Sequence, residues 1–176
     1  MKDPKRKYSA QREILKLSFE NPQALYADFE FFVELLNHSN SIFVWAGLLV
    51  LGNLSSVDRE KKIDTVLESM IAKLNTGKMI TAGNALKSLI VVGKSRPDLA
   101  NHIVEELIKI KKYEYDTEEC INVLLGLLYA SVFQIWDNLD LTHRDKLTQL
   151  AKANIANTRN ATAKKAQRFL RITNRK

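Results

Sequence analysis

Apolar residues recur at helical spacing along most of the chain, and no segment of any length shows the period-two alternation of a strand. The segments 23–37, 59–74 and 97–112 are amphipathic, with an apolar stripe opposite acidic or basic residues. The segments 41–54, 79–92 and 121–136 are apolar on nearly every side, which is typical of helices buried all round. The expected helices span about 9–20, 23–37, 41–54, 59–74, 79–92, 97–112, 116–136, 143–154 and 160–173.

Local signals mark the ends of several of these helices. Ser9 is the expected N-cap of the first helix, and Asn21-Pro22 ends it because a residue before proline avoids the α region. The segment 55–58 is expected to end one helix and cap the next. Gly77 suits the left-handed position after a helix, and Pro97 suits the first turn of the following one.

A sequence repeat relates the apolar helices to one another. The segment 45–52 begins Trp-Ala-Gly-Leu-Leu, and 81–89 begins Thr-Ala-Gly-Asn-Ala, 36 residues later. Fainter echoes lie at 123–128 and 163–170. Steps of about 36 to 41 residues suit a pair of antiparallel helices, which predicts a stacked helical array. The glycines within it are expected to permit close helix packing.

In this repeat the chain resembles HEAT-type repeats over roughly 9–173, and armadillo-type units would have a similar layout. The resemblance implies an all-α fold: an α-solenoid of about four stacked HEAT-like helix pairs plus a C-terminal capping helix. A single domain would then cover 9–176, preceded by a basic N-terminal tail, 1–8. The resemblance also implies a concave binding face lined by the second helix of each pair, and it carries over no catalytic residue.

Charge is distributed unevenly along the 176 residues, whose net charge is +7. Residues 1–17 hold six Lys/Arg and two acids, and 141–176 hold ten Lys/Arg and one acid. The middle, 18–140, holds 11 Lys/Arg and 17 acids. Basic ends on an acidic body suggest a polyanionic partner, with the alternative that the terminal units of a solenoid need a polar outer face.

Composition also predicts where the protein resides. The single cysteine, Cys120, excludes an internal disulfide and fits a reducing compartment. The charged start, 1–7, is not a secretory signal. The longest uninterrupted apolar run, 42–51, is too short to cross a bilayer. These features predict a cytoplasmic protein without a membrane segment, and two polar ends favour a monomer.

Enzymatic signatures are weak, so we expect a non-enzymatic protein with no cofactor and no metal. The three histidines, His38, His102 and His143, are widely spaced, and no glycine-rich phosphate loop is present. Trp136-Asp137 resembles the base-stacking residue beside a carboxylate in HEAT-like DNA glycosylases of alkylation repair. That hypothesis requires both residues to face one groove.

The last helix is the best candidate for a binding surface. Lys164, Arg168, Arg171 and Arg175 fall within about 60° of one another on a helical wheel. The apolar residues lie opposite and are expected to pack on the helix 143–154. The candidate residues for an anionic partner are Arg159, Lys164, Lys165, Arg168, Arg171 and Arg175, with Lys152 at the margin. Phosphate binding uses such rows, because neutralising phosphates releases counterions. The row lacks an exposed aromatic for base stacking and an Asn/Gln set for base edges, which predicts weak sequence preference. A solvated cap face is the alternative.

Two functions follow from these features. The leading hypothesis is a scaffold or adaptor that binds another protein through the concave row, graded from acidic residues at 28–34 to basic residues at 144–152. The alternative is nucleic-acid binding through the basic last helix, helped by the N-terminal Lys/Arg cluster. A glycosylase is a distant third.

Overall fold

The computed structural model describes residues 4–174 of the chain, and this part is helical, without a strand. The all-α prediction is therefore confirmed. The α-helices are α1 (Pro4–Glu20), α2 (Phe29–Leu35), α3 (Ser41–Leu54), α4 (Lys62–Ala72), α5 (Met79–Ser95), α6 (Ala100–Ile108), α7 (Glu118–Ser131), α8 (Leu141–Lys152) and α9 (Asn160–Thr173). Short 3-10 segments join or extend them: η1 (Pro22–Asp28), η2 (Ser55–Val57), η3 (Lys73–Asn75), η4 (Pro97–Leu99), η5 (Lys109–Lys112) and η6 (Val132–Asn138).

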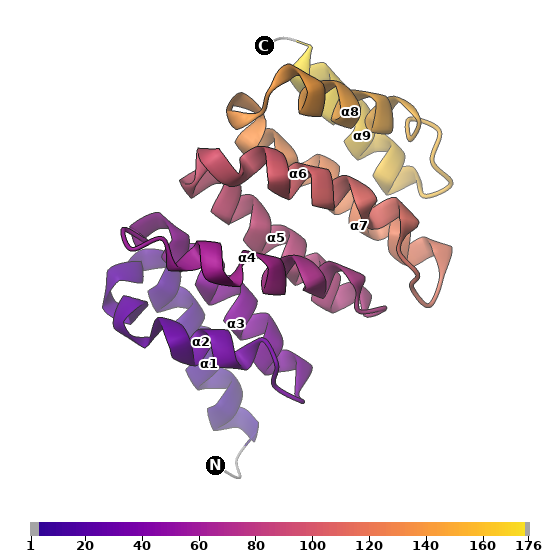
Figure 1. Ribbon diagram of the computed structural model, residues 1–176. Helices are drawn as coiled ribbons and strands as arrows, with labels where there is room; N and C mark the ends of the chain where they lie inside the picture. The colour runs from indigo at the N-terminus through magenta and orange to yellow at the C-terminus, as the bar shows by residue number, and fades with distance from the viewer. Residues whose placement is uncertain (1–3, 175–176) are drawn as a thin grey trace.

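The helices form two rows, which we call the odd row and the even row (Figure 1). In the odd row, α1, α3, α5, α7 and α9 follow one another in chain order, each packed on the next. The even row contains α2, α4, α6 and α8. The two ends of the chain lie at opposite ends of the stack. The core runs between the rows and is built from the apolar stripes of both.

Hydrogen bonds between successive helices of a row join residues that are separated by a similar number of positions along the chain. Trp45 Nε1 donates to Thr81 Oγ1 across 36 residues, at 2.9 Å. Thr162 Oγ1 donates to the Asn122 carbonyl across 40 residues, at 2.6 Å. The side-chain hydrogen bonds that join successive units span between 31 and 45 residues along the chain. Side-chain hydrogen bonds thus tie together helices that lie roughly one helix pair apart in the chain.

Glycines allow the close approach within this packing that the sequence predicts. A Cβ at Gly47 would lie 2.8 Å from the backbone oxygen of Phe32 on α2. A Cβ at Gly52 would lie 2.6 Å from the Ser88 hydroxyl on α5. Both distances are shorter than real Cβ atoms tolerate, so these positions accept only glycine without a shift of the helices.

Several helix ends differ from their predicted positions. Helices α3 and α9 begin and end as expected, but α1 begins at Pro4 and not at Ser9. The Ser9 hydroxyl donates to Glu13 Oε1 at 3.0 Å, one turn later, so it does not cap the helix. Helix α8 begins two residues early, because Asp140 accepts from the His143 backbone N–H at 2.8 Å.

The amphipathic segments are only partly α-helical. The expected helices 23–37 and 97–112 open as the 3-10 segments η1 and η4, each beginning at a proline, and the second closes as η5. The expected helix 116–136 becomes 3-10 after Ser131, whose hydroxyl donates back to the Leu127 carbonyl at 2.9 Å. Such back-bonding competes with regular helix geometry. The expected helix 59–74 begins at Lys62, after Lys61 adopts a left-handed φ of 57°.

One segment is long and apolar enough to cross a membrane, judged by length and composition alone. It is Glu118–Asn138, which joins α7 to η6. The sequence prediction considered only the longest uninterrupted apolar run, 42–51. It therefore missed Glu118–Asn138, which polar residues interrupt. In the structure this segment packs between α5 and α9 and supplies core residues such as Leu128 and Ile135. Core helices of soluble proteins pass the same test.

Candidate anion-binding surface on the C-terminal helix

Helix α9 has a buried face and a cationic face, as its sequence predicts. Ala163, Ala166 and Phe169 are buried. The prediction that they pack on the preceding helix was incomplete, because α9 packs on both α7 and α8. The Phe169 ring meets Trp136 edge-on, with ring centroids 5.4 Å apart, and lies 6.1 Å from Tyr129 of α7. These aromatic contacts fix the orientation of α9 on the end of the stack.

Four cations form the opposite face of α9, and we call them the α9 cation row. They are Lys164, Lys165, Arg168 and Arg171, all exposed. None of the ion pairs between described residues involves them. Helix α9 itself carries no acidic residue. The row therefore presents uncompensated positive charge to solvent.

The structure separates two predicted residues from this row. Arg159 is only half-exposed, and its guanidinium pairs with Glu119 at the start of α7. That ion pair ties the beginning of α9 to α7, so including Arg159 among the free cations was wrong. Arg175 lies outside the described residues. Lys152 is exposed at the end of α8.

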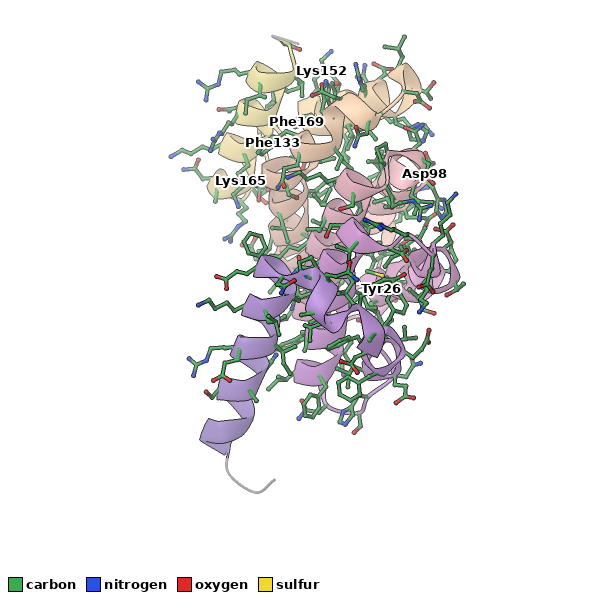
Figure 2. All side chains as sticks on the ribbon, turned by 90° about the vertical axis from the view of Figure 1, so that its left-hand side faces the viewer. Tyr26, Asp98, Phe133, Lys152, Lys165 and Phe169 are labelled. Carbon is green, nitrogen blue, oxygen red and sulfur yellow. The ribbon has the colours of Figure 1, made fainter. Side chains whose placement is uncertain are left out.

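A pocket of about 170 Å³ opens beside the cation row, between α9 and the end of α7. We call it the α7–α9 pocket. Figure 2 shows Phe133, Phe169 and Lys165 close together at this end of the molecule. Phe133 on η6 forms one wall and is 37% exposed. The pocket is lined by Tyr129, Ala130, Phe133, Lys165, Arg168, Phe169 and Ile172.

Buried aromatic residues make the floor of the α7–α9 pocket rigid. The Tyr129 hydroxyl donates to the Leu150 carbonyl of α8 at 3.1 Å. Burial raises the pKa of Tyr129 above its ordinary value, so this phenol stays a neutral donor. Lys165 packs its aliphatic stem toward Gly126, its Cδ lying 3.5 Å from where a Cβ would stand. The pocket thus combines a fixed apolar floor with two cationic rims.

Phe133 was not predicted as a site residue, because the segment 121–136 was expected to be buried throughout. The buried positions of that segment include Leu125, Leu128, Val132 and Ile135. Phe133 belongs with exposed Ala130 on the opposite side. A helical wheel of this segment would have placed Phe133 on the side away from the buried positions. The described part of α9 exposes no aromatic, as expected, and the exposed ring beside the cation row comes from η6.

The even row carries its charges differently, because many of them are paired with each other across successive helices. Arg96 pairs with Asp64 at 2.7 Å and with Asp98 at 2.6 Å. Hydrogen bonds to these carboxylates raise the pKa of Arg96, and the guanidinium lowers that of Asp98. Lys146 of α8 pairs with Glu105 of α6 at 2.6 Å and lowers the pKa of that carboxyl. Much of the even-row charge is consequently neutralised inside the protein.

The predicted gradient of charge along the even row is therefore only partly free for a partner. Asp28, Glu30 and Glu34 at its acidic end are exposed, and no ion pair of the described residues involves them. At the basic end, Lys146 is paired with Glu105. The Arg144 guanidinium donates to the Trp136 carbonyl and lies 5.6 Å from the centre of that indole ring.

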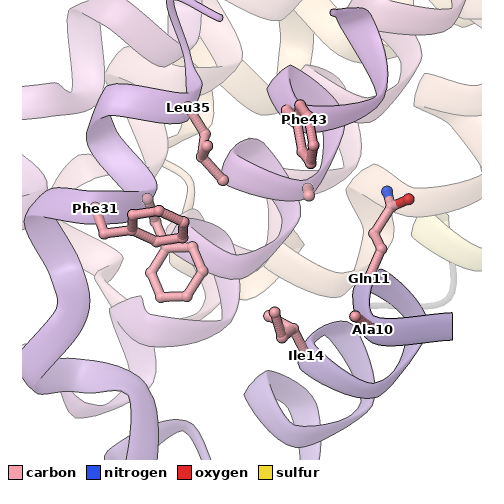
Figure 3. A pocket seen from close by; sticks show the side chains of 8 residues that line it. Ala10, Gln11, Ile14, Phe31, Leu35 and Phe43 are labelled. Carbon is pink, nitrogen blue, oxygen red and sulfur yellow. The ribbon is translucent and has the colours of Figure 1, made fainter. Parts of the chain in front are cut away.

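An apolar groove lies at the other end of the stack, between α1, α2 and α3 (Figure 3). Its volume is about 390 Å³. Phe31 is 53% exposed at its edge. Gln11 is the polar residue among those that line it, and its amide donates to the Ile42 carbonyl. The lining comprises Ala10, Gln11, Ile14, Phe31, Phe32, Leu35, Phe43 and Ala46.

The remaining chemical candidates do not assemble a site. Trp136 is 6% exposed and packs in the core, so its interpretation as a base-stacking residue beside Asp137 was wrong. His102 bonds to Glu68 at 2.7 Å, and His143 bonds to Asp140 at 2.7 Å. Among the described residues, no group of three His, Cys, Asp or Glu side chains is placed to hold a metal ion.

Comparison with family models, curated proteins and solved structures found no match to this chain. What the α9 surface can do therefore follows from its own residues. An uncompensated row of cations attracts polyanions, and an exposed aromatic ring beside it offers a flat apolar surface.

Proposed function

We propose that the chain is a HEAT-like helical-repeat module, an α-solenoid of about four helix pairs capped by α9, without catalytic activity. The similar chain separations, 31 to 45 residues, of the hydrogen bonds that join one helix pair to the next support this. In a repeat array each unit contacts only its neighbours, so such a narrow range is expected. The two rows of helices are also in keeping with it.

The module binds nucleic acid through the α9 cation row. One observation carries this proposal: four exposed cations on one helix have no acidic partner, while other cations, such as Lys146 of α8 and Arg96 between α5 and α6, are paired. Lys and Arg that contact phosphates release condensed counterions, which supplies most of the affinity. A cap face that served only solubility would not require its cations to be free of acids.

The first prediction concerns the double variant Arg168→Glu and Arg171→Glu. Wild-type affinity for a labelled single-stranded oligonucleotide should fall with salt, with a log–log slope of about −3 for four phosphate contacts. In the double variant, affinity should fall at least tenfold at low salt and the slope should drop to half or less. Fluorescence anisotropy across a salt series measures both quantities.

The matched control is the double variant Arg59→Glu and Lys111→Glu. Both residues are exposed, neither lies on α7 or α9, and the net charge changes equally. This control should keep most of the affinity and the full slope, and circular dichroism should show both variants folded. Equal losses in the two variants would reduce the effect to net charge, and no binding by the wild type would end the proposal.

A second candidate function is the binding of a protein partner, and the apolar groove between α1, α2 and α3 favours it. The occupant we propose is an amphipathic helix with apolar anchors and basic flanking residues. Its anchors match the apolar lining, and its basic residues match exposed Glu30 and Glu34, which precede groove residues Phe31 and Leu35 on α2. The amide nitrogen of Gln11, the polar lining residue, is already bonded to the Ile42 carbonyl, so the groove offers mainly apolar contacts.

The prediction for this second function uses Phe31→Glu. A basic helical protein retained from cell extract by the wild type should be lost from this variant, because a carboxylate replaces the exposed ring. The same protein should still be retained by the Arg168→Glu and Arg171→Glu variant. If the Phe31→Glu variant retains this protein as well as the wild type does, the groove is ruled out as the docking site.

A further inference from the structure

The α7–α9 pocket has a shape and composition that the cation row alone does not explain. We infer that it receives one unpaired nucleobase, stacked on Phe133, so that the protein prefers single-stranded nucleic acid to duplex. The inference rests on the proposed binding of nucleic acid and names the form of the ligand. It is carried by the juxtaposition of Phe133, Lys165 and Arg168 around one cavity.

The aromatic wall suits a base because every base has a flat π-face. Phe133 exposes 37% of its surface, on the same exposed side of the segment as Ala130. Beneath it, Phe169 is 1% exposed and held by Trp136 and Tyr129, so the floor does not collapse to cover the ring. Stacking on such a platform is tolerant of base identity.

The lining of this pocket offers no amide side chain among the described residues. The Tyr129 hydroxyl is engaged by the Leu150 carbonyl, and the other polar lining residues, Lys165 and Arg168, are cations. Such cations can favour guanine, but stacking on an aromatic face accepts any base. The inferred site therefore selects for single strands and only weakly for sequence.

Cations lie beside Phe133 on α9, and others are exposed on α5, the helix that η6 packs against. Lys165 and Arg168 are those on α9. Asn138 of η6 donates to the Gly93 carbonyl at 3.0 Å, which holds η6 against α5. Lys87 and Lys94 are exposed on α5 and belong to no ion pair of the described residues. A backbone crossing α9, η6 and α5 would meet cations on both α-helices.

A duplex cannot use the pocket without losing a base pair. Its bases are stacked and paired inside the helix, so insertion requires extrusion of a nucleotide at a cost of a few kcal/mol. A single strand offers its bases freely. The α9 cation row would hold either form through phosphates, and only the single strand would add the stacking contribution.

The experiment compares three labelled ligands of about 16 nucleotides, a length that covers a single-strand binding site. They are a single strand of mixed sequence, its duplex, and the same strand with abasic sites in place of its bases. Phe133→Ala should weaken binding of the single strand by about 5- to 150-fold, the range for loss of one stacking platform. The same substitution should leave binding of the abasic strand and of the duplex unchanged.

Two further variants separate stacking from packing. Phe133→Tyr should bind the single strand like the wild type, because it keeps an aromatic face. Phe133→Leu should behave like Phe133→Ala, although it retains apolar bulk. Equal affinity of wild type for single strand, duplex and abasic strand would overturn the inference while leaving the proposed function standing. Loss of all binding in the Arg168→Glu and Arg171→Glu variant, without any effect of Phe133→Ala, would do the same.

Discussion

At the scale of single residues, buried polar side chains connect elements that are distant along the chain. Asp58 is 8% exposed and accepts from the Tyr26 hydroxyl at 2.5 Å. Its two carboxylate oxygens also accept from the backbone N–H groups of Lys62 and Ile63, at 2.9 Å each. One carboxylate therefore caps α4 and anchors η1. The capping role is predictable from sequence, whereas the bond to Tyr26 is not, because it depends on how η1 folds back.

Tyrosine burial gives the protein a predictable response to alkaline pH. Burial is the main cause that raises the pKa of Tyr26 to about 12 and that of Tyr115 to about 12, from an ordinary value of 10.0. A raised pKa means that the folded state holds its protons more tightly than the unfolded state. The contribution to stability is therefore complete below pH 10 and is lost as pH rises from about 10 to about 12.

We expect the free energy of unfolding to fall across this window, with each tyrosine contributing at most about 1.4 kcal/mol per pH unit. Urea unfolding at a series of pH values from 8 to 12 measures it. Tyr26→Phe should lower stability at neutral pH, since Asp58 loses a donor, and should lessen the alkaline decline. A decline identical in wild type and variant would contradict the assignment to Tyr26.

At the scale of elements, glycines of the odd row lie both at close helix contacts and at looser ones. Gly47 and Gly83 occupy equivalent positions in the two copies of the sequence repeat. A Cβ at Gly47 would meet the Phe32 backbone oxygen at 2.8 Å, whereas one at Gly83 would meet the Leu127 side chain at 3.6 Å. The repeat in the sequence thus conceals two different environments.

Alanine substitution should therefore have opposite effects at these two positions. Gly47→Ala should lower the free energy of unfolding by about 1–3 kcal/mol, because the backbone of α2 must move. Gly83→Ala should leave it unchanged or raise it by up to about 1 kcal/mol, through better helix propensity and ordinary van der Waals contact. Chemical denaturation of both variants tests this, and a loss of similar size at both positions would count against it.

Helix positions were predictable from sequence to the extent that apolar periodicity controls them. The bounds of α3 and α9 were correct, because each has a distinct polar break at both ends. The 3-10 segments were not foreseen, since periodicity does not distinguish i+3 from i+4 hydrogen bonding over one turn. For the same reason the exposure of Phe133 was not predicted, because Phe133 lies where α7 passes into η6.

At the scale of the whole molecule, the two ends of the stack differ in their exposed charge, and ion pairing affects this difference as well as composition. Sequence counts identified the basic C-terminal end and four of the exposed cations correctly. They could not show that Arg159 pairs with Glu119, or that Lys146 pairs with Glu105, because those partners lie 40 and 41 residues away. Pairing, and not the count of cations, decides which positive charges are available to a ligand.

The short chain separations between hydrogen-bonded helices bear on the order in which the protein folds during synthesis. No side-chain hydrogen bond between described residues reaches further than the 45 residues that separate Asn138 from Gly93. Loop closure over such short distances is entropically cheap, and proteins rich in local contacts fold quickly for their size. During synthesis, α1 and α3 meet their partners before α7 and α9 have left the ribosome. The N-terminal half is therefore expected to fold first, with the α9 surface completed last, on a scaffold that already exists.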